Sequence, residues 1–153
     1  MNEPLLKFAL TRPGATLPQR ATPGSGAFDF YAPEDGGVDS KSIVTIKTGI
    51  IHQPVLDEIL PGFKLQGICL PRSGLAVKQG IRLFYEGLVD NDYRGEIHIS
   101  LENCSAYRYE WKAGERLCQV GYMLMYIGGI QLITPEELDV TFRGSGGFGH
   151  TGR

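Results

Sequence analysis

Residues 71–76 contain an arginine, a hydroxyl group and a glycine in a row, a combination that can bind an anion. Arg72, Ser73 and Gly74 follow an apolar run and precede a stretch suited to a short helix. All three can direct donors at one anion, and the unpaired backbone N–H groups of a helix start add to them. An ordinary helix start with a surface arginine would use the same residues, so the segment is a candidate phosphate site that needs support from elsewhere.

Residues 87–95 place an acid and an aromatic side chain at a turn. We predict that they form the tip of a hairpin, between a strand that ends near Val89 and an alternating strand that starts at Glu96. Asp90 would then be a carboxylate held at a strand end, able to act as a general base toward water. Tyr93 would offer a flat face to a sugar or base. Any tight turn also favours Asp, Asn and Gly, so a purely structural explanation stays open.

Residues 143–152 are rich in glycine but also carry groups that can bind a nucleotide. Arg143 and Thr151 are phosphate partners, glycines such as Gly149 let backbone N–H groups approach an anion, and Phe148 can stack on a base. A solvated tail has the same composition. The functional alternative is a lid that orders over a nucleotide, which divides the chain into a β domain of residues 1–142 and a lid of residues 143–153.

Two weaker candidates lie in apolar surroundings. Asp29 stands among apolar neighbours in residues 26–32, where a carboxylate is costly unless it is paired or near a metal ion. Residues 114–119 lead into a buried strand, with Gln119 facing inward. Either segment could simply be a turn followed by a strand.

The elements that must position these residues are short, because 21 glycines and nine prolines interrupt the chain. Residues 96–102 and 107–111 alternate between apolar and polar types, and residues 42–51 are rich in β-branched side chains. Residues 67–70 and 120–127 are continuous apolar runs, which suit strands buried on both faces. The sequence therefore predicts many short strands, an all-β class, and a jelly-roll-like or barrel architecture.

Helical signals are confined to one or two short turns. Residues 73–79 have Ser73 as an expected N-cap and Gly80 as an expected C-cap. Residues 54–60 predict a second short turn before the break at Pro61.

Composition and charge limit the partners and the compartment. A chain of 153 residues suits one domain, and a net charge of -2 gives no electrostatic footprint for a nucleic acid or a membrane surface. Cys69, Cys104 and Cys118 have no metal-ligand spacing and lie in apolar or strand-like runs, so we expect buried reduced thiols. The first residues do not look like a signal peptide. These features favour a cytoplasmic protein, or one in a host's cytoplasm if the chain is viral.

Taken in order, the five candidate segments resemble the five signature motifs of the trimeric dUTPase family. The correspondence covers residues 27–32, 71–76, 87–95, 114–119 and 143–152, which together span nearly the whole chain. The resemblance implies a jelly-roll-like β-clip subunit that forms a homotrimer with active sites shared between chains. It also implies hydrolysis of dUTP to dUMP and pyrophosphate, which keeps uracil out of DNA and supplies dUMP for dTMP synthesis.

The resemblance also implies roles for individual residues. Asp90 would activate the water and contact the 3′-hydroxyl, Gln119 would help to place that water, and Arg143 would close on the γ-phosphate. Mg²⁺ would be held mainly by the triphosphate and water, with Asp29 near it through water or orienting Arg72, and water would attack the α-phosphorus in line. The substrate-binding set would comprise Arg72, Ser73 and Gly74 on the phosphates, Gly87, Leu88, Val89 and Asp90 with the backbone near His98 on uracil, Tyr93 on the deoxyribose, and Arg143, Phe148, Gly149 and Thr151 in the lid.

Two stretches depart from the family pattern, and two rival functions remain. Residues 84–87 are bulkier than expected before the third motif, and residues 52–60 have no role that the resemblance assigns. A dCTP deaminase would share the fold, but it would need a glutamate base and a serine-rich helix start, so residues 71–76 favour dUTPase. A nucleotide-switched module that binds a regulatory protein partner is the rival from another class.

Overall fold

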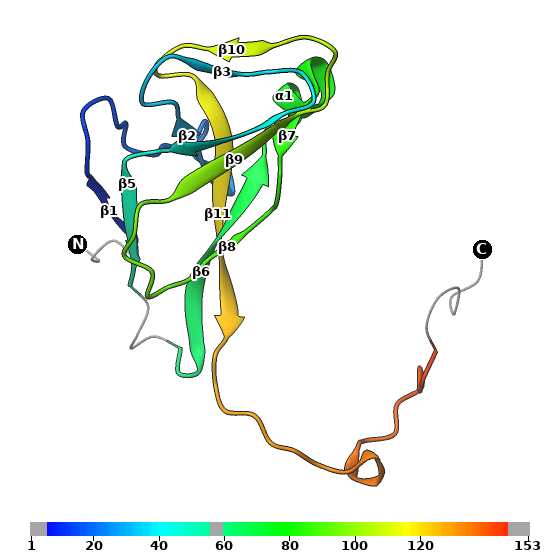
Figure 1. The fold of residues 1–153 in the computed structure, drawn as a ribbon. Coiled ribbons are helices and arrows are strands. Elements are labelled where there is room, and N and C mark those ends of the chain that lie inside the picture. The colour runs from blue at the N-terminus through cyan, green and yellow to red at the C-terminus, as the bar shows by residue number, and fades with distance from the viewer. Residues whose placement is uncertain (1–5, 56–59, 147–153) are drawn as a thin grey trace.

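The computed structural model describes residues 6–55 and 60–146, which form a body of short antiparallel strands followed by an extended C-terminal arm (Figure 1). One α-helix and one 3₁₀ turn accompany the strands, which matches the all-β class predicted from the sequence. The elements in chain order are β1 Leu6–Leu10, β2 Ala27–Tyr31, β3 Gly36–Val38, β4 Ile43–Lys47, β5 Ile50–Pro54, β6 Phe63–Pro71, α1 Ser73–Gln79, β7 Ile81–Leu83, β8 Leu88–Val89, β9 His98–Asn103, β10 Tyr109–Trp111, β11 Arg116–Tyr126 and the 3₁₀ turn Pro135–Glu137.

The described strands form four small sheets around one core. The largest has the order β2-β11-β6-β8, and a second has the order β4-β9-β7. Two further pairs join β1 to β5 and β3 to β10. The longest ladder runs between β11 and β6, from Cys118 opposite Pro71 to Tyr126 opposite Phe63.

Strand alternation explains which side chains form the core. In β9, Ile99 and Leu101 are buried, whereas His98 at the start of the strand is exposed. The inward residues of the two larger sheets meet in one hydrophobic cluster, which removes apolar surface from water and supplies the main driving force for folding. Cys69 and Cys118 belong to this cluster, Cys104 is partly buried, and all three are free thiols, as expected.

The strand expected over residues 42–51 is in fact two strands in different sheets. Gly49 interrupts it with a φ of 74°, a left-handed conformation that favours glycine. A side chain there would also collide with Arg12 and Ala15. β4 before this corner pairs with β9, and β5 after it pairs with β1.

The helix over residues 73–79 has the expected bounds and the expected C-cap, Gly80, at φ 67°. The expected N-cap is wrong, because the extended residue before the helix is Arg72 and Ser73 is already helical. No side chain caps this end, although the carbonyl of Arg72 accepts a hydrogen bond from Ala76 N at 3.0 Å. The second short turn predicted over residues 54–60 falls largely on residues 56–59, which lie outside the described residues.

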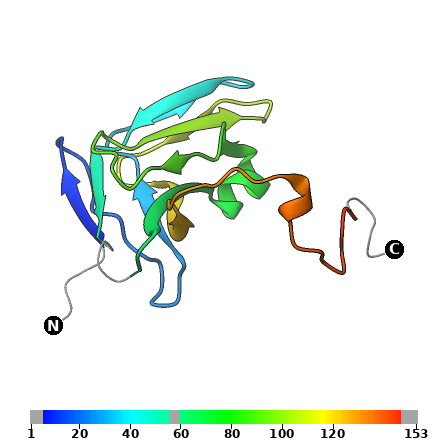
Figure 2. The same ribbon diagram turned by 90° about the horizontal axis from the view of Figure 1, so that it is seen from below.

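The second half of β11 corrects another expectation. Residues 120–127 were predicted to be buried on both faces, but Met123 is 52% exposed and Tyr126 is 61% exposed. The reason is that β2 pairs with β11 only as far as Gly121, so among the described strands the rest of β11 pairs with β6 alone. From residue 127 the chain leaves the body as the arm, which projects to one side in both views (Figures 1 and 2).

The arm carries apolar side chains that none of the described residues covers. Ile130 is 99% exposed and Val140 is 100% exposed. Its single 3₁₀ turn is closed by Glu137, whose carboxylate accepts a hydrogen bond from Thr134 N at 2.8 Å. Among the described residues no helix is long and apolar enough to cross a membrane.

Candidate active site

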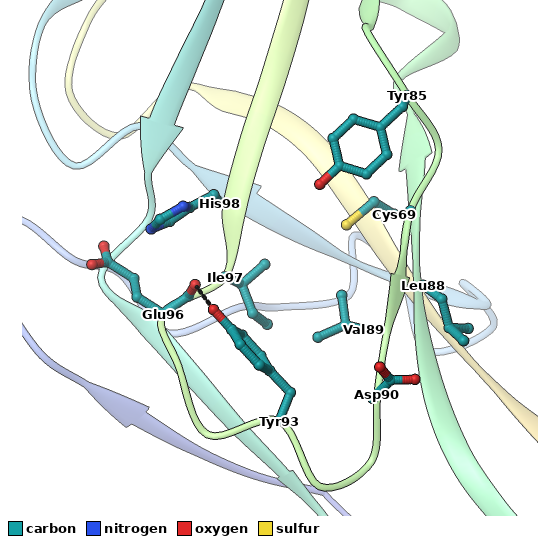
Figure 3. Close-up of a pocket in the computed structure, with 10 residues that line it drawn as sticks. Cys69, Tyr85, Leu88, Val89, Asp90, Tyr93, Glu96, Ile97 and His98 are labelled. Atoms are coloured by element: carbon teal, nitrogen blue, oxygen red, sulfur yellow. Dashed lines mark hydrogen bonds between the residues drawn. The ribbon is translucent and has the colours of Figure 1, made fainter.

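A pocket of about 310 Å³ opens where β8 ends and β9 begins (Figure 3). Its walls come from the end of β6, the stretch before β8, the loop after β8 and the start of β9. The lining residues are Cys69, Tyr85, Gly87, Leu88, Val89, Asp90, Tyr93, Glu96, Ile97 and His98. The pocket therefore brings together Gly87 to Asp90, Tyr93 and His98, to which the family resemblance assigned substrate contacts.

The connection that forms this pocket differs from the predicted hairpin. β8 pairs with β6, whereas β9 pairs with β4 and β7, so the two strands belong to different sheets. The intervening residues 90–97 cross from one sheet to the other and leave space between them. This separation, rather than a tight hairpin tip, is what makes room for a ligand.

The wall before Asp90 is fixed by backbone hydrogen bonds. Cys69 N donates to Gly87 O at 3.0 Å, and Val89 lies opposite Gly67 in the ladder with β6. Val89 points into the pocket and Leu88 points to the other side of the strand, as alternation requires (Figure 3). This wall offers backbone groups and a short apolar side chain to a flat ligand.

Two tyrosines border the opening. Tyr93 donates its hydroxyl to Glu96 O at 3.0 Å, and its ring lies over Gly95 so closely that any side chain there would collide with it. Tyr85 projects its hydroxyl into the pocket from the opposite side (Figure 3) and packs in the same way over Gly87. Both rings are thus positioned by glycines next to them.

Asp90 stands at the end of β8 with an exposed side chain and a firmly held backbone. Its carbonyl accepts hydrogen bonds from His52 Nε2 at 3.0 Å and from Tyr93 N at 3.0 Å. The next amide, Asn91 N, donates to Gln66 Oε1 at 2.5 Å. A carboxylate on such a fixed support is suited to general-base chemistry.

A second polar cluster surrounds Asp29, which is only 2% exposed. Arg72 Nε lies 3.6 Å from one carboxylate oxygen, and Arg116 Nη1 lies 3.2 Å from the other. Gln119 Nε2 donates to Asp29 at 3.2 Å, and Arg72 Nη1 donates to Arg116 O at 2.8 Å. One acid between two arginines leaves a net positive charge, which suits an anionic ligand.

Asp29 faces arginines in this cluster, so its oxygens are already engaged by cations. Among residues 6–55 and 60–146, no three His, Cys, Asp or Glu side chains gather as a metal site would require. Burial raises the pKa of the neighbouring Cys118 thiol well above its usual value, which keeps it protonated and a poor metal ligand. The described residues therefore show no protein cage for an Mg²⁺ ion, and such an ion would need oxygens from a ligand and from water.

The structure does not bring all the predicted site residues together within one chain. Arg72, Asp29 and Gln119 lie in the second cluster and do not line the pocket of Asp90. Ser73 and Gly74 are exposed at the start of α1, and a side chain at Gly74 would meet nothing within 4 Å. Arg143 lies on the arm, where it donates to Gly146 O at 2.8 Å. Phe148, Gly149 and Thr151 lie outside the described residues.

Sequence reasoning missed residues in both sites and in the support behind Asp90, and the pocket residues that it missed are Cys69, Tyr85, Glu96 and Ile97. Arg116 belongs to a segment that was singled out, and an arginine three residues before Gln119 in a strand start was the available signal. Tyr85 lies in a stretch noticed only for its bulk. His52 and Gln66 are distant in sequence from Asp90, and no local pattern predicts that they meet its backbone.

Comparison of the sequence with known proteins identifies the protein family. A protein-family model described as dUTPase matches residues 14–152. Deoxyuridine 5′-triphosphate nucleotidohydrolase of Debaryomyces hansenii is 36% identical over 151 residues, which cover 99% of this chain and 89% of the relative. The enzyme of the same name from Acinetobacter baumannii is 38% identical over 143 residues, which cover 90% of this chain and 88% of the relative.

Solved structures share the fold at lower identity. The dUTPase of Staphylococcus bacteriophage 80alpha with dUPNHPP aligns with a TM-score of 0.77 at 22% identity, covering 97% of this chain and 98% of that chain. That phage protein is described as controlling the transfer of virulence genes. A mutant dUTPase from phage phi11 of S. aureus, described with a structural Mg(II) ion, aligns with a TM-score of 0.73 at 18% identity, covering 87% of this chain and 99% of that chain.

Proposed function

The chain belongs to the dUTPase family and is a dUTP diphosphatase, and we propose that the pocket of Asp90 holds the nucleoside while the Asp29 cluster serves the phosphates. The observation that carries this assignment is the position of Asp90. It directly follows β8, whose backbone forms one pocket wall, and both Asp90 and His98 at the start of β9 line the pocket. A ligand in the pocket would therefore lie between a backbone edge and a carboxylate.

The pocket supports selection of a pyrimidine nucleoside by shape and by backbone contacts. Uracil would lie against the wall made by Gly87, Leu88 and Val89 with the backbone near His98. A backbone slot of this kind pairs with uracil, excludes the methyl group of thymine, and meets the wrong donors in cytosine. Tyr93, held by Glu96, would pack on the deoxyribose and leave no space for a 2′-hydroxyl group.

Asp90 would activate the attacking water. The carboxylate accepts one proton from water, the water oxygen forms a bond to the α-phosphorus, and the bond from that phosphorus to the bridging oxygen breaks. dUMP and pyrophosphate result, and the electron pair of the broken bond leaves with pyrophosphate. Gln119 would help to orient the water.

The phosphates would meet Arg72, Ser73 and Gly74 at the start of α1. The contact between Arg72 and buried Asp29 supports the alternative in which Asp29 orients that arginine. The other role predicted for Asp29, a contact with Mg²⁺ through a bound water, stays a prediction. Bound Mg²⁺ would neutralise charge on the triphosphate and stabilise the departing pyrophosphate. Arg143 on the γ-phosphate and Phe148 on the base would close the site, as parts of a lid over residues 143–153.

A homotrimer with shared sites would explain both the divided site and the exposed arm. Within one chain Arg72 and Asp29 do not line the pocket of Asp90, and the arm presents exposed apolar side chains such as Ile130, Leu132 and Val140. Extended apolar surface of this kind marks a protein interface. We therefore propose that the arm packs on another copy and that Asp90 and Arg72 of one site come from different chains.

Co-expression of two inactive variants tests the shared site. An Asp90→Asn chain and an Arg72→Ala chain should each be inactive alone, and random mixing should restore about a quarter of the wild-type activity. Recovery of no activity in mixed trimers would place each site within one chain.

The regulatory protein partner and the cytoplasmic location stay predictions.

The nucleotide panel tests the pocket itself. Purified protein with Mg²⁺ should release pyrophosphate from dUTP and leave dTTP, dCTP and UTP largely untouched. Comparable turnover of dTTP would contradict the role of the backbone wall, and comparable turnover of UTP would contradict the role of Tyr93.

A further inference from the structure

The peptide bond between Asp90 and Asn91 is held at both ends by buried side chains. Its carbonyl oxygen accepts from His52 Nε2 at 3.0 Å, and its N–H donates to Gln66 Oε1 at 2.5 Å. His52 is 0% exposed and Gln66 is 7% exposed. Both come from strands outside the loop, His52 from β5 and Gln66 from β6.

From this geometry we propose that His52 and Gln66 are positioning residues, which clamp the Asp90–Asn91 peptide and so aim the Asp90 carboxylate at the attacking water. The inference rests on the proposed role of Asp90 as the general base. It assigns a function to His52, which begins the stretch for which the sequence offered none.

The tautomer of His52 follows from its partners. A carbonyl oxygen can only accept, so Nε2 carries the proton that it donates to Asp90 O. In a neutral ring Nδ1 is then an acceptor, and it accepts a hydrogen bond from the hydroxyl of Tyr122 at 2.9 Å. Burial lowers the pKa of His52 and raises the pKa of Tyr122, which keeps the ring neutral and the hydroxyl protonated.

The clamp is set in rigid surroundings. Tyr122 lies in β11 and packs edge-on against Phe8 and Phe28, with ring centroids 6.3 and 6.1 Å away. On the other side of the peptide, Asn91 Nδ2 donates to Leu65 O at 3.0 Å, which joins the same loop to β6 a second time. The orientation of the base is thereby tied to the largest sheet.

The pocket wall before Asp90 does not depend on this clamp. It is held by the ladder between β8 and β6 and by the hydrogen bond from Cys69 N to Gly87 O. Loss of the clamp should therefore affect turnover more than nucleotide binding. A small misplacement of a reacting group is enough to reduce turnover strongly.

Steady-state kinetics of the full-length enzyme with dUTP test the proposal. His52→Met removes the donor at similar length, and kcat should fall about 10- to 100-fold while KM changes less than about 3-fold. His52→Gln, whose amide can donate to the same carbonyl, is the matched control and should restore kcat to within about 3-fold of wild type. Gln66→Met loosens the same peptide from its N–H side and should reproduce the kcat loss, so it carries the test if His52→Met does not fold.

A double-mutant cycle separates this proposal from the function beneath it. In an Asp90→Asn background, His52→Met should lower the residual kcat by less than about 2-fold, because the group that it positions is gone. Three results would overturn the proposal. The first is that His52→Met lowers kcat in the Asp90→Asn background by the same factor as in the wild type. The others are a normal kcat in both His52→Met and Gln66→Met, and a rise in KM with kcat unchanged. Normal turnover in Asp90→Asn would instead refute Asp90 as the base.

Discussion

Replacing Asp29 by asparagine should weaken both the fold and phosphate binding, because this buried carboxylate sits between two arginines. Its oxygens lie 3.6 Å from Arg72 Nε and 3.2 Å from Arg116 Nη1. With an effective dielectric constant of about 20, each such ion pair has a Coulomb energy of about 5 kcal/mol before desolvation is subtracted. The partial exposure of both arginines and the desolvation of Asp29 reduce the net loss to about 2–3 kcal/mol.

For a domain of this size, that loss lowers the midpoint of thermal unfolding by about 4–12 °C. Asparagine also releases Arg72, so KM for dUTP should rise about 10-fold, the loss of one charge-assisted contact. Circular dichroism melts and pyrophosphate-release kinetics measure the two effects. Asp35→Asn is the control, since its ion pair with Lys112 is exposed and should leave the melt nearly unchanged.

An unchanged melting midpoint together with an unchanged KM in Asp29→Asn would refute this reasoning. The same variant also distinguishes the two roles considered for Asp29. If it orients Arg72, added Mg²⁺ should not restore KM. Restoration by Mg²⁺ would instead place Asp29 at the metal through water.

Three further predictions concern the base, the lid and the buried histidine. Asp90→Asn should bind a non-hydrolysable dUTP analogue normally in calorimetry and lose at least about 100-fold in kcat; normal turnover would remove Asp90 as the base. Truncation before Arg143 should leave a folded oligomer in sedimentation experiments with poor catalysis, and unfolding would show that the tail is structural. Burial and the charge of Arg94 lower the pKa of His52 in the folded protein. As the pH falls, the unfolded chain therefore binds a proton at this histidine before the folded protein does. The stability that His52 contributes above pH 6.5 should be lost as the pH falls through the lowered pKa. The wild-type melting midpoint should then fall more steeply from pH 7.5 to 5 than that of His52→Gln, and parallel curves would contradict a neutral His52.

Local patterns in the sequence predicted local structure well. Gly80 ends α1 in the left-handed conformation expected of a C-cap, and Ile99 and Leu101 are buried as the alternation of β9 requires. Both outcomes depend on neighbours within a few residues. The expected N-cap at Ser73 failed because the residue before a helix need not use its side chain as a cap, and Arg72 instead turns toward Asp29.

Contacts between residues that are distant in sequence could not be predicted from such patterns. The residues around Asp90 look like a hairpin, yet β8 and β9 join different sheets, and only the pairing of β8 with β6 reveals the pocket. His52 lies 38 residues from Asp90, and its hydrogen bond depends on the corner at Gly49 that sends β5 to another sheet. The apolar run in β11 predicted burial because the sequence does not show where β2 stops pairing.

Hydrolysis of dUTP in water enriched in ¹⁸O tests most directly whether this site cleaves dUTP by attack at the α-phosphorus. Mass spectrometry of a single turnover should find one ¹⁸O atom in dUMP and none in pyrophosphate. Label in pyrophosphate, or no release of dUMP in the presence of Mg²⁺, would contradict the account.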